Sequence, residues 1–179
     1  MQPRIPRQSA GEQDARRPDG ADHDDRLSPE LASVVSGARR RAVRDGDRQI
    51  DTAHLLHSLL ESDPEVCAVL GDGPQLARLL GYLVQRSIGY GLRWQGTVED
   101  SGAVPAVRET AGLSPSAATA IDRAGGRAVR RGAVLAGGVD LLAALVTDPG
   151  ARAVEVLGRA GVDAEAVLAR VGGWVEPRS

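Results

Sequence analysis

Several residue types are missing or scarce in this 179-residue chain, and each absence excludes something. The chain contains no lysine, no phenylalanine and a single cysteine, Cys67. Without lysine it cannot hold the phosphate-binding P-loop, whose ammonium group contacts nucleotide phosphates. A lone cysteine cannot form an internal disulfide. Only 2% of the residues are aromatic, so a core must be built from alanine, valine and leucine.

A strong charge bias and long apolar runs are also missing. The formal net charge of −2 provides no global positive field of the kind that nonspecific nucleic-acid binding requires. No segment resembles a secretory signal or an apolar run of membrane-spanning length. We therefore expect a soluble cytoplasmic protein without nucleic-acid or membrane partners. The arginine-only, alanine- and glycine-rich usage is typical of a GC-rich, actinobacterial-like genome and indicates no function.

What the chain does contain is an internal repeat. Residues 27–60 align without a gap with residues 113–146 at an offset of 86 (113 − 27), and 13 of the 34 paired positions are identical. A repeated run of amphipathic segments indicates two copies of one supersecondary unit, each covering the apolar face of the other. This favours a scaffold with binding surfaces over a buried catalytic cluster.

Each copy predicts four helices. Ser28-Pro29 and Ser114-Pro115 are typical helix starts, with an N-cap serine followed by proline, and we expect the first helices to end near Gly46 and Gly132. The residues at i, i+3 and i+4 spacing that we expect on the buried faces of the first helices are Leu31, Val34, Val35, Ala38 and Ala42, and in the second copy Ala117, Ala120, Ile121, Ala124 and Ala128. Asp51-Thr52 is expected to begin the second helix, with Gly137-Gly138 at the same place in the second copy.

The fold class is therefore all-α, with two pseudo-symmetric four-helix repeats and eight helices in total. The predicted organisation is a disordered leader (1–26), a repeat domain (27–175) and a short tail (176–179). Within the domain, the first repeat covers 27–90, a linker covers 91–112 and the second repeat covers 113–175. Charge, proline and glycine dominate the leader, which has too few large apolar residues to offset the entropy of ordering.

The duplicated pattern resembles the Clp repeat, the double amino-terminal domain of ClpC- and ClpA-type AAA+ unfoldases. In that family a capped helix and a glycine turn precede the motif I-G-T-E-H-L-L-L-G-L. Residues 50–59, IDTAHLLHSL, match it best, and residues 137–145 are a more degenerate copy. The resemblance extends from Leu27 to about Val175.

The resemblance implies a docking platform for adaptors, degrons and small cyclic peptides. In ClpC-type members it also implies binding of phosphorylated arginine through the glutamate of each motif. Those two positions are Ala53 and Val139 here, so the charge-assisted bonds to a guanidinium group are lost. We expect phosphoarginine binding to be weak or absent. The motif histidine is His54 in the first copy and Asp140 in the second.

The resemblance also shows a departure from the full unfoldases. The sequence ends five residues after Trp174, and we expect a stand-alone receptor domain without ATPase domains. The partners it implies are a Clp-type ATPase, adaptor or substrate peptides, and a cyclic peptide in the alternative described below.

Candidate catalytic and metal-binding groups are few. Nothing in the sequence positions Cys67 against His54 or His57 as a nucleophile with its base, and a buried inert thiol is the better interpretation. His54 and His57 have an i, i+3 spacing that two metal ligands can use, with Asp51 one turn earlier, but a further ligand has no obvious source. We predict no enzyme, no cofactor and no metal. His54 is expected to bond a ring nitrogen to the backbone of the neighbouring helix.

The candidate binding residues are arginines and aromatics. Aromatic residues and arginine are favoured at binding hot spots, and Tyr90, Arg93 and Trp94 concentrate them in a groove expected between the two halves. Arginines also give each first helix a basic edge, with Arg40 and Arg44 in the first copy and Arg127 and Arg131 in the second. The competing interpretations are a solvated face balanced by acids for the arginines, and core packing for the nearby Tyr82.

We predict a non-catalytic peptide- or protein-binding Clp-repeat protein that modulates Clp-type proteolysis, as an adaptor, competitor or decoy for the unfoldase amino-terminal domain. The alternative is a protein that sequesters or senses a small molecule such as a cyclic peptide antibiotic. A nucleic-acid or regulatory binder using the arginine strip fits less well, because no aromatics alternate with the arginines for stacking.

Overall fold

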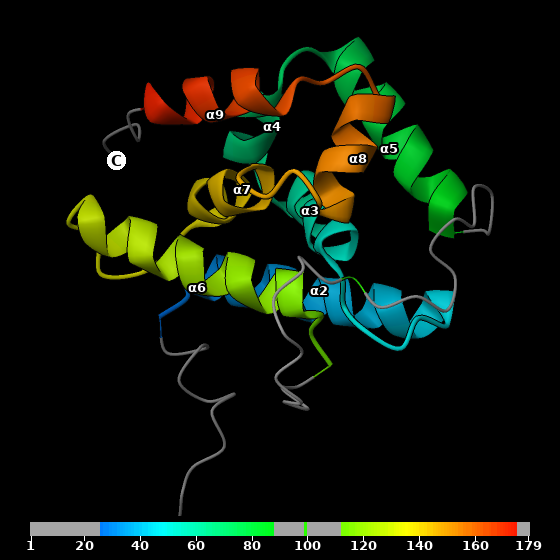
Figure 1. The fold of residues 1–179 in the computed structure, drawn as a ribbon, viewed down its shortest axis with the longest axis horizontal. Coiled ribbons are helices and arrows are strands. Elements are labelled where there is room, and N and C mark those ends of the chain that lie inside the picture. Colours follow the sequence, from blue (N-terminus) through cyan, green and yellow to red (C-terminus); the bar gives the residue numbers. More distant parts are fainter. Residues whose placement is uncertain (1–25, 88–98, 100–111, 175–179) are drawn as a thin grey trace, which may run out of the picture.

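The computed structural model describes residues 26–87, Glu99 and residues 112–174. These residues form eight α-helices and confirm the all-α class with four helices per repeat (Figure 1). The first repeat holds α2 (Pro29–Asp45), α3 (Thr52–Ser62), α4 (Pro64–Leu70) and α5 (Gly73–Ser87). The second repeat holds α6 (Pro115–Arg130), α7 (Gly138–Val146), α8 (Arg152–Arg159) and α9 (Ala164–Gly172).

The first helices of the two repeats begin and end as the sequence predicts. The side chains of Ser28 and Ser114 accept hydrogen bonds from the backbone N of Leu31 and Ala117, each at 3.1 Å. These bonds satisfy one of the amide groups that a helix start leaves without a partner. Gly46 and Gly132 follow the helix ends with positive φ angles of 73° and 79°, a conformation that costs a residue with a Cβ more than it costs glycine.

The two repeats are joined by a pair of exchanged backbone bridges. Leu27 pairs with Ala136, and Leu113 pairs with Ile50, both in parallel. Residues 27 and 113, like residues 50 and 136, are equivalent under the offset of 86. The backbone N of Ser28 donates to the Ala136 carbonyl (3.0 Å), and that of Ser114 to the Ile50 carbonyl (2.9 Å). Each repeat therefore begins by pairing with the other, and the two halves form one interlocked unit.

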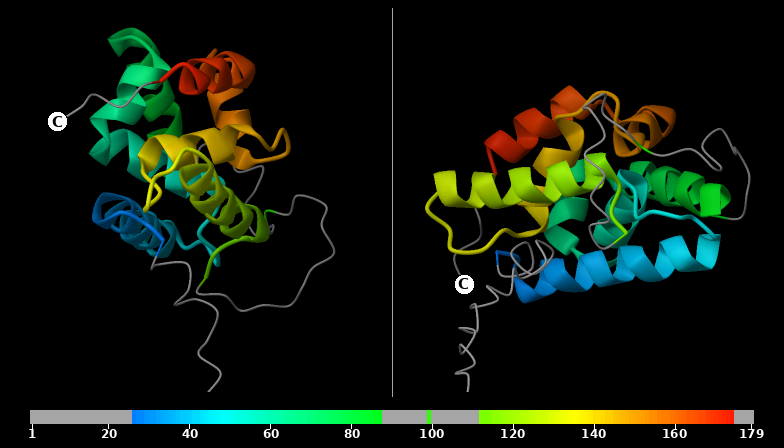
Figure 2. Two further views of the ribbon diagram at one scale, coloured as in Figure 1. Left: turned by 90° about the vertical axis from the view of Figure 1, so that its left-hand side faces the viewer. Right: turned by 60° about the horizontal axis from the view of Figure 1, so that its bottom comes forward.

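The helix packing follows the same exchange. In Figure 1 and the two further views of Figure 2, α3 and α7 lie at the centre, with α2 and α6 on one side and the remaining helices on the other. Contacts between the repeats come in matched pairs: α3 with α8 and α7 with α4, then α5 with α8 and α9 with α4. Almost every residue of α3 and α7 is buried as a result. The second helix of each repeat is thus the core of the domain.

The expected buried faces of α2 and α6 are confirmed at every residue predicted for them. Two apolar residues of the last helices are exposed, Val84 on α5 at 49% and Leu168 on α9 at 39%. These peripheral helices bury only one stripe, formed by Leu79 and Leu83 on α5. The predicted leader, most of the linker and the tail lie outside the described residues, so those boundaries remain predictions.

Candidate functional site

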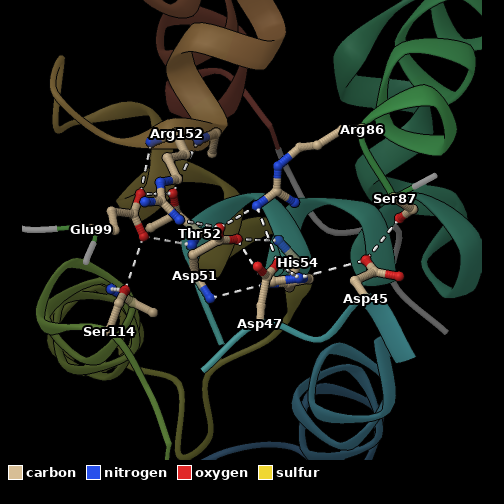
Figure 3. Close-up of polar contacts among 12 residues, drawn as sticks. Asp45, Asp47, Asp51, Thr52, His54, Arg86, Ser87, Glu99, Ser114 and Arg152 are labelled. Carbon is tan, nitrogen blue, oxygen red and sulfur yellow. Dashed lines mark hydrogen bonds and ion pairs between the residues drawn. The ribbon is translucent and has the colours of Figure 1, made fainter. Parts of the chain in front are cut away.

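A buried polar network lies at the start of α3 and draws on both repeats (Figure 3). Asp51 and His54 come from the first repeat, Arg152 from the second, and Glu99 from the segment between them. The members labelled in the figure are Asp45, Asp47, Asp51, Thr52, His54, Arg86, Ser87, Glu99, Ser114 and Arg152. Buried charged groups are costly unless they are paired and hydrogen-bonded, so each charged member of this network needs a partner.

Asp51 and His54 form a reciprocal cap at the start of α3. The carboxylate Oδ1 of Asp51 accepts from the backbone N of His54 at 2.8 Å, and Nδ1 of His54 accepts from the backbone N of Asp51 at 3.1 Å. This is the arrangement of a capping box with histidine in the place of the usual glutamate. The prediction that His54 bonds to the neighbouring helix was wrong: its backbone partner is the cap of its own helix, three residues back.

The other oxygen of Asp51 faces two guanidinium groups. Arg152 Nη1 lies 2.8 Å from Oδ2, and Arg86 Nη2 also donates to it. Burial alone would raise the pKa of Asp51, but the hydrogen bond and charge of His54, with the guanidinium groups of Arg86 and Arg152, lower it far below its ordinary value. Asp51 is therefore a carboxylate that ties α3 of one repeat to α8 of the other.

Glu99 fills an anion site built from helix starts. Its Oε2 accepts from the backbone N of Thr52 (2.8 Å) and from Oγ of Ser114 (2.9 Å), and its Oε1 accepts from the backbone N of Arg152 (2.7 Å) and from the Thr52 hydroxyl. Backbone amides at the first turns of α3 and α8 supply the partial positive charge that favours a carboxylate there. Glu99 thereby fixes one point of the segment between the repeats against both of them.

One nitrogen of the network is unusual. His54 Nε2 is buried and has no hydrogen-bond partner among the described residues. Two carboxylate oxygens face it, Asp47 Oδ2 at 3.1 Å and Asp45 Oδ2 at 3.7 Å. Asp45 Oδ2 also accepts a hydrogen bond from the Ser87 hydroxyl at 2.8 Å. An imidazole nitrogen and two carboxylates therefore converge on one point beside α2 and α3.

The second repeat treats the equivalent positions differently. Asp45 corresponds to Arg131 and His54 to Asp140. Arg131 binds Asp140 through two hydrogen bonds of 3.0 and 2.8 Å, and Arg127 Nε lies 3.3 Å from the same carboxylate. Asp140 also caps α7 by accepting from the backbone N of Gly137 at 3.0 Å. Here the chain itself supplies the cation that faces the buried group.

Two arginines of the predicted basic edge already have partners in the structure. Arg127 and Arg131 both contact Asp140 and are about one-third exposed, and Arg127 also donates to the Val171 carbonyl. An acidic ligand would have to compete with Asp140 there, and binding at these two residues remains a prediction. Arg40 and Arg44 remain at the surface of α2. The third predicted set, Tyr90, Arg93 and Trp94, lies outside the described residues, so the groove expected there remains a prediction. Tyr82 packs partly buried against the core, with the Arg159 guanidinium 5.7 Å from its ring centre.

Arg40 and Arg44 border a groove along α2 and α3 of the first repeat. Two adjoining hollows of about 550 and 460 Å³ share Arg41, Arg44 and Glu61, and the Arg41–Glu61 ion pair lies between them. Small residues line the first hollow, namely Ser33, Gly37, Ser58 and Ser62. His57, Val84 and Ser87 line the second. We call these two hollows the α2–α3 groove.

The lining of the α2–α3 groove holds three arginines, Arg40, Arg41 and Arg44, against two acids, Asp45 and Glu61. Burial, followed by the charges of Arg41 and Arg44, lowers the pKa of His57 to about 4, so this histidine is neutral near pH 7. Its Nε2 has no hydrogen-bond partner among the described residues and lies 3.4 Å from Glu61 Oε1.

The second repeat differs at the glycine that lines the first hollow. The residue equivalent to Gly37 is Arg123, so a long side chain replaces the glycine there.

A further hollow of about 410 Å³ lies where the repeats meet. Ser28, Glu30, Val34 and residues 62–65 line one side, and Arg131, Leu135, Gly137 and Gly138 line the other. A Cβ at Gly138 would lie 1.9 Å from Asp63 Oδ2, so a larger residue there would force the Asp63 side chain to move. The equivalent residue of the first repeat is Thr52.

The positions of the missing motif glutamates differ in exposure. Ala53 is completely buried on α3, and Val139 is partly buried against the core. Neither side chain offers a hydrogen-bonding group. Cys67 is partly buried and donates to the Leu60 carbonyl, and burial together with the charge of Asp63 raises its thiol pKa. A raised pKa disfavours the reactive thiolate, in agreement with the predicted inert cysteine.

Sequence reasoning did not identify Glu99, Arg86 and Arg152 as members of a site. Each is a charged residue in a segment that the repeat does not align, and only the fold brings them within reach of Asp51 and Thr52. One signal was present: Asp51 precedes a strongly apolar helix, where an acid is either a cap or part of an ion pair.

Solved structures show the same architecture. The N-terminal domain of the caseinolytic-protease-associated chaperone ClpD from Arabidopsis thaliana superposes with a TM-score of 0.60 at 20% identity, covering 83% of this chain and 93% of that one. This chain has the fold of a Clp amino-terminal domain. A structure from a malarial protein secretion system gives the same TM-score and coverages at 15% identity.

Sequence comparison adds no relatives to this structural likeness. No protein-family model matches the chain, and no curated protein matches it. The likeness to a Clp amino-terminal domain therefore concerns the fold alone. None of the described helices is long and apolar enough to cross a membrane.

Proposed function

We propose that this Clp-type domain is a non-catalytic binding module that takes a peptide or protein segment in the α2–α3 groove and thereby modulates Clp-type proteolysis. The observation that carries the proposal is the groove itself, on a fold shared with a chaperone's N-terminal domain. Within the proposal, the module acts as an adaptor, a competitor or a decoy for an unfoldase amino-terminal domain. A cytoplasmic location is part of the same proposal.

The chemistry of the α2–α3 groove favours an acidic segment. Arg40 and Arg44 stand at its edge, and the only carboxylates among its lining residues are Asp45 and Glu61. Asp45 is already hydrogen-bonded to Ser87, and Glu61 is paired with Arg41. An acidic side chain of a ligand can therefore meet Arg40, and it can meet Arg44 through the nitrogens other than Nε, which lies 3.3 Å from Asp45 Oδ1. The hydroxyls of Ser33, Ser58 and Ser62 supply further polar partners for its backbone.

The remaining polar groups support a role without catalysis. Asp51 and Glu99 are held by several donors each, and the Cys67 thiol is disfavoured as a nucleophile. A catalytic base needs to be within reach of a substrate proton and free to accept it. The carboxylates of the network instead hold the two repeats together.

Binding to acidic peptides tests the groove directly. We expect a fluorescein-labelled glutamate-rich peptide to bind in low salt, and the double variant R40E/R44E to weaken binding at least about ten-fold by replacing attraction with repulsion. The matched control is R123E/R130E on α6, which makes the same charge change on the second repeat. Equal loss in both variants would show that only net charge matters and would overturn the groove assignment.

Contact with the proteolytic machinery tests the wider role. Crosslinking of the chain in cell extract, followed by capture, is expected to recover a Clp-type ATPase or one of its adaptors in the parent and to lose it in R40E/R44E. Failure to recover either protein with the parent chain would contradict the proteolysis part of the proposal while leaving peptide binding intact.

A second candidate function rests on the hollow between the repeats. Its volume of about 410 Å³ and its mixed lining, with Val34 and Leu135 beside polar groups, suit a small organic ligand. A protein that sequesters or senses a cyclic peptide would use it. Thermal-shift measurements with cyclic peptides in excess test this candidate, since a ligand that binds the folded state raises its melting temperature. No rise would remove it.

Two ligand classes are proposed not to bind tightly. This chain has no carboxylate at position 53 or 139 with which to bind a phosphoarginine peptide. Submicromolar binding of such a peptide would therefore contradict our expectation. The arginine strip also has no aromatic residues among its arginines on which bases could stack. Tight binding of a random oligonucleotide in low salt would contradict the expectation that nucleic acid binds weakly.

A further inference from the structure

We propose that Asp45, Asp47 and His54 form a binding site for one divalent transition-metal ion of the zinc type in the first repeat. This inference departs from the sequence-based expectation of no metal and is independent of the proposed function. Its starting point is the convergence of one imidazole nitrogen and two carboxylate oxygens, whose ligand atoms all lie within 4.8 Å of one another (Figure 3).

The spacing of the three ligand atoms suits a metal. Zinc binds imidazole nitrogen and carboxylate oxygen at about 2.0–2.2 Å in a tetrahedral arrangement, which places neighbouring ligand atoms roughly 3.3 Å apart. His54 Nε2 lies 3.1 Å from Asp47 Oδ2 and 3.7 Å from Asp45 Oδ2, on either side of that value. Small side-chain adjustments are enough to bind an ion.

The orientation of the imidazole favours a metal at Nε2. His54 is 1% exposed and its Nε2 lacks a hydrogen-bond partner within the described part of the chain. Its other nitrogen, Nδ1, lies 2.8 Å from Asp51 Oδ1. In the capping box Nδ1 accepts from the backbone N of Asp51. A metal at Nε2 moves the ring proton to Nδ1, where Asp51 Oδ1 accepts it, so that the Nε2 lone pair faces Asp45 and Asp47. A carboxylate behind a metal-binding histidine is the usual way of fixing its tautomer and orientation.

The charges around the site leave two carboxylates for the ion. Arg86 and Arg152 are directed at Asp51. Arg44 Nε lies 3.3 Å from Asp45 Oδ1, but its side chain is 62% exposed and can swing into solvent. Arg86 is 3.9 Å from Asp47 Oδ2. Asp45 and Asp47 together balance a divalent cation, and the Ser87 hydroxyl bonded to Asp45 supports that ligand from behind.

The second repeat gives an independent argument that this place takes a cation. There Arg131 replaces Asp45, Ala133 replaces Asp47 and Asp140 replaces His54. The guanidinium of Arg131 bonds to Asp140 through both oxygens. In the second repeat, the Arg131 side chain thus supplies the cation at this place. In the first repeat, the same place presents Asp45, Asp47 and His54 as ligands for a metal ion from solution. Asp47, whose side chain is 28% exposed, provides the route of entry.

Isothermal titration of the full chain, first treated with chelator, tests the site with ZnCl₂ as the probe. We expect about one equivalent to bind, and CoCl₂ to give visible absorption bands of tetrahedral nitrogen and oxygen coordination. The variant D47N keeps the size of a half-buried side chain and is expected to weaken zinc binding at least about ten-fold. The variant H54Q is expected to abolish the cobalt spectrum.

Control variants separate this site from other ligands of the chain. H23Q removes a histidine far away in sequence, and D148N removes a carboxylate of the second repeat; both are expected to bind zinc like the parent. If H54Q does not fold, D47N and the cobalt spectrum decide alone. Absence of zinc binding, or binding that survives D47N but is lost in H23Q, would overturn the proposal. The first result would leave Asp45, Asp47 and His54 as a polar cluster that binds no metal.

Discussion

The two repeats share a backbone plan but differ in how they neutralise the same buried place. The apolar positions of α2 and α6, and of α3 and α7, are filled in register, and both first helices start with a serine cap. At the start of the second helix, the first repeat has Asp51 and His54 where the second has Gly137 and Asp140. Packing thus constrains the shared apolar residues, whereas the polar residues are free to diverge as long as each charge finds a partner.

The difference extends to the links between the repeats. Asp51 and Glu99 receive donors from α8 and from the start of α6, so the first repeat's polar network crosses to the second. Asp140 in the second repeat is instead neutralised within its own repeat, by Arg127 and Arg131. Substitutions on the first side are therefore expected to affect the whole domain, and the following predictions compare matched positions.

The largest effect is expected from Asp51→Asn. Asparagine keeps an oxygen for the cap of α3 but removes the negative charge that Arg86 and Arg152 face in a buried setting. Removing one partner of a buried ion pair costs about 3–5 kcal/mol of unfolding free energy. The matched substitution Gly137→Ala, where a Cβ has open space, is expected to cost less than about 1 kcal/mol. Chemical denaturation of both variants measures the difference; equal losses would contradict the asymmetry.

The next effect is a pH dependence that His57 contributes in the first repeat. The pKa of His57 is about 4 in the folded state against 6.5 ordinarily, so the unfolded chain binds more protons between these values. Stability contributed by this group is therefore present above pH 6.5 and falls as the pH drops towards 4, by roughly 3 kcal/mol at most.

Position 143, the equivalent in the second repeat, is alanine and adds no such term. Denaturation midpoints measured from pH 7.5 to pH 4 should fall less steeply in His57→Gln than in the parent. Parallel pH profiles for the two proteins would show that His57 is protonated in the folded state.

Much of the comparison was predictable from sequence. Helix ends such as Ser28-Pro29 and Gly46 are encoded locally, because caps and positive φ angles depend on adjacent residues. The duplicated sequence predicted that two similar units pack against each other. The network around Asp51 was not predictable, because Glu99, Arg86 and Arg152 reach it from 48, 35 and 101 residues away (99 − 51, 86 − 51, 152 − 51). The pairing of Arg127 and Arg131 with Asp140 was not predictable either, because only the fold brings this buried acid beside the end of α6.

A smaller effect is expected from Glu99→Gln. The Glu99 carboxylate accepts hydrogen bonds at both oxygens, from groups that include the backbone N of Thr52 and of Arg152. Glutamine replaces one of these oxygens with an NH₂ group, which would face donors with further donors. Leaving buried donors without an acceptor costs about 1–3 kcal/mol. Thermal unfolding checks the loss against Glu165→Gln at the exposed start of α9, for which a shift within about 1 kcal/mol is expected. If the two shifts were equal, the anion site at the helix starts would be unimportant.

The finest comparison is between the two N-cap serines. Ser28→Ala and Ser114→Ala each remove a cap worth about 1 kcal/mol. Ser114 also donates to Glu99, so its replacement is expected to cost about 1 kcal/mol more. Equilibrium denaturation of the two single variants resolves the difference, and in the background of Glu99→Gln the extra cost of Ser114→Ala should disappear.

The central claim is that the first repeat offers the binding surface and the second serves mainly as its structural partner. NMR titration of the isotope-labelled chain with a glutamate-rich peptide tests it residue by residue. The account predicts shifts at Ser33, Gly37, Arg40, Arg44 and Ser58, with little change at the equivalent Thr119, Arg123, Gly126, Arg130 and Ala144. Shifts of equal size on both repeats, or confined to the second, would contradict it.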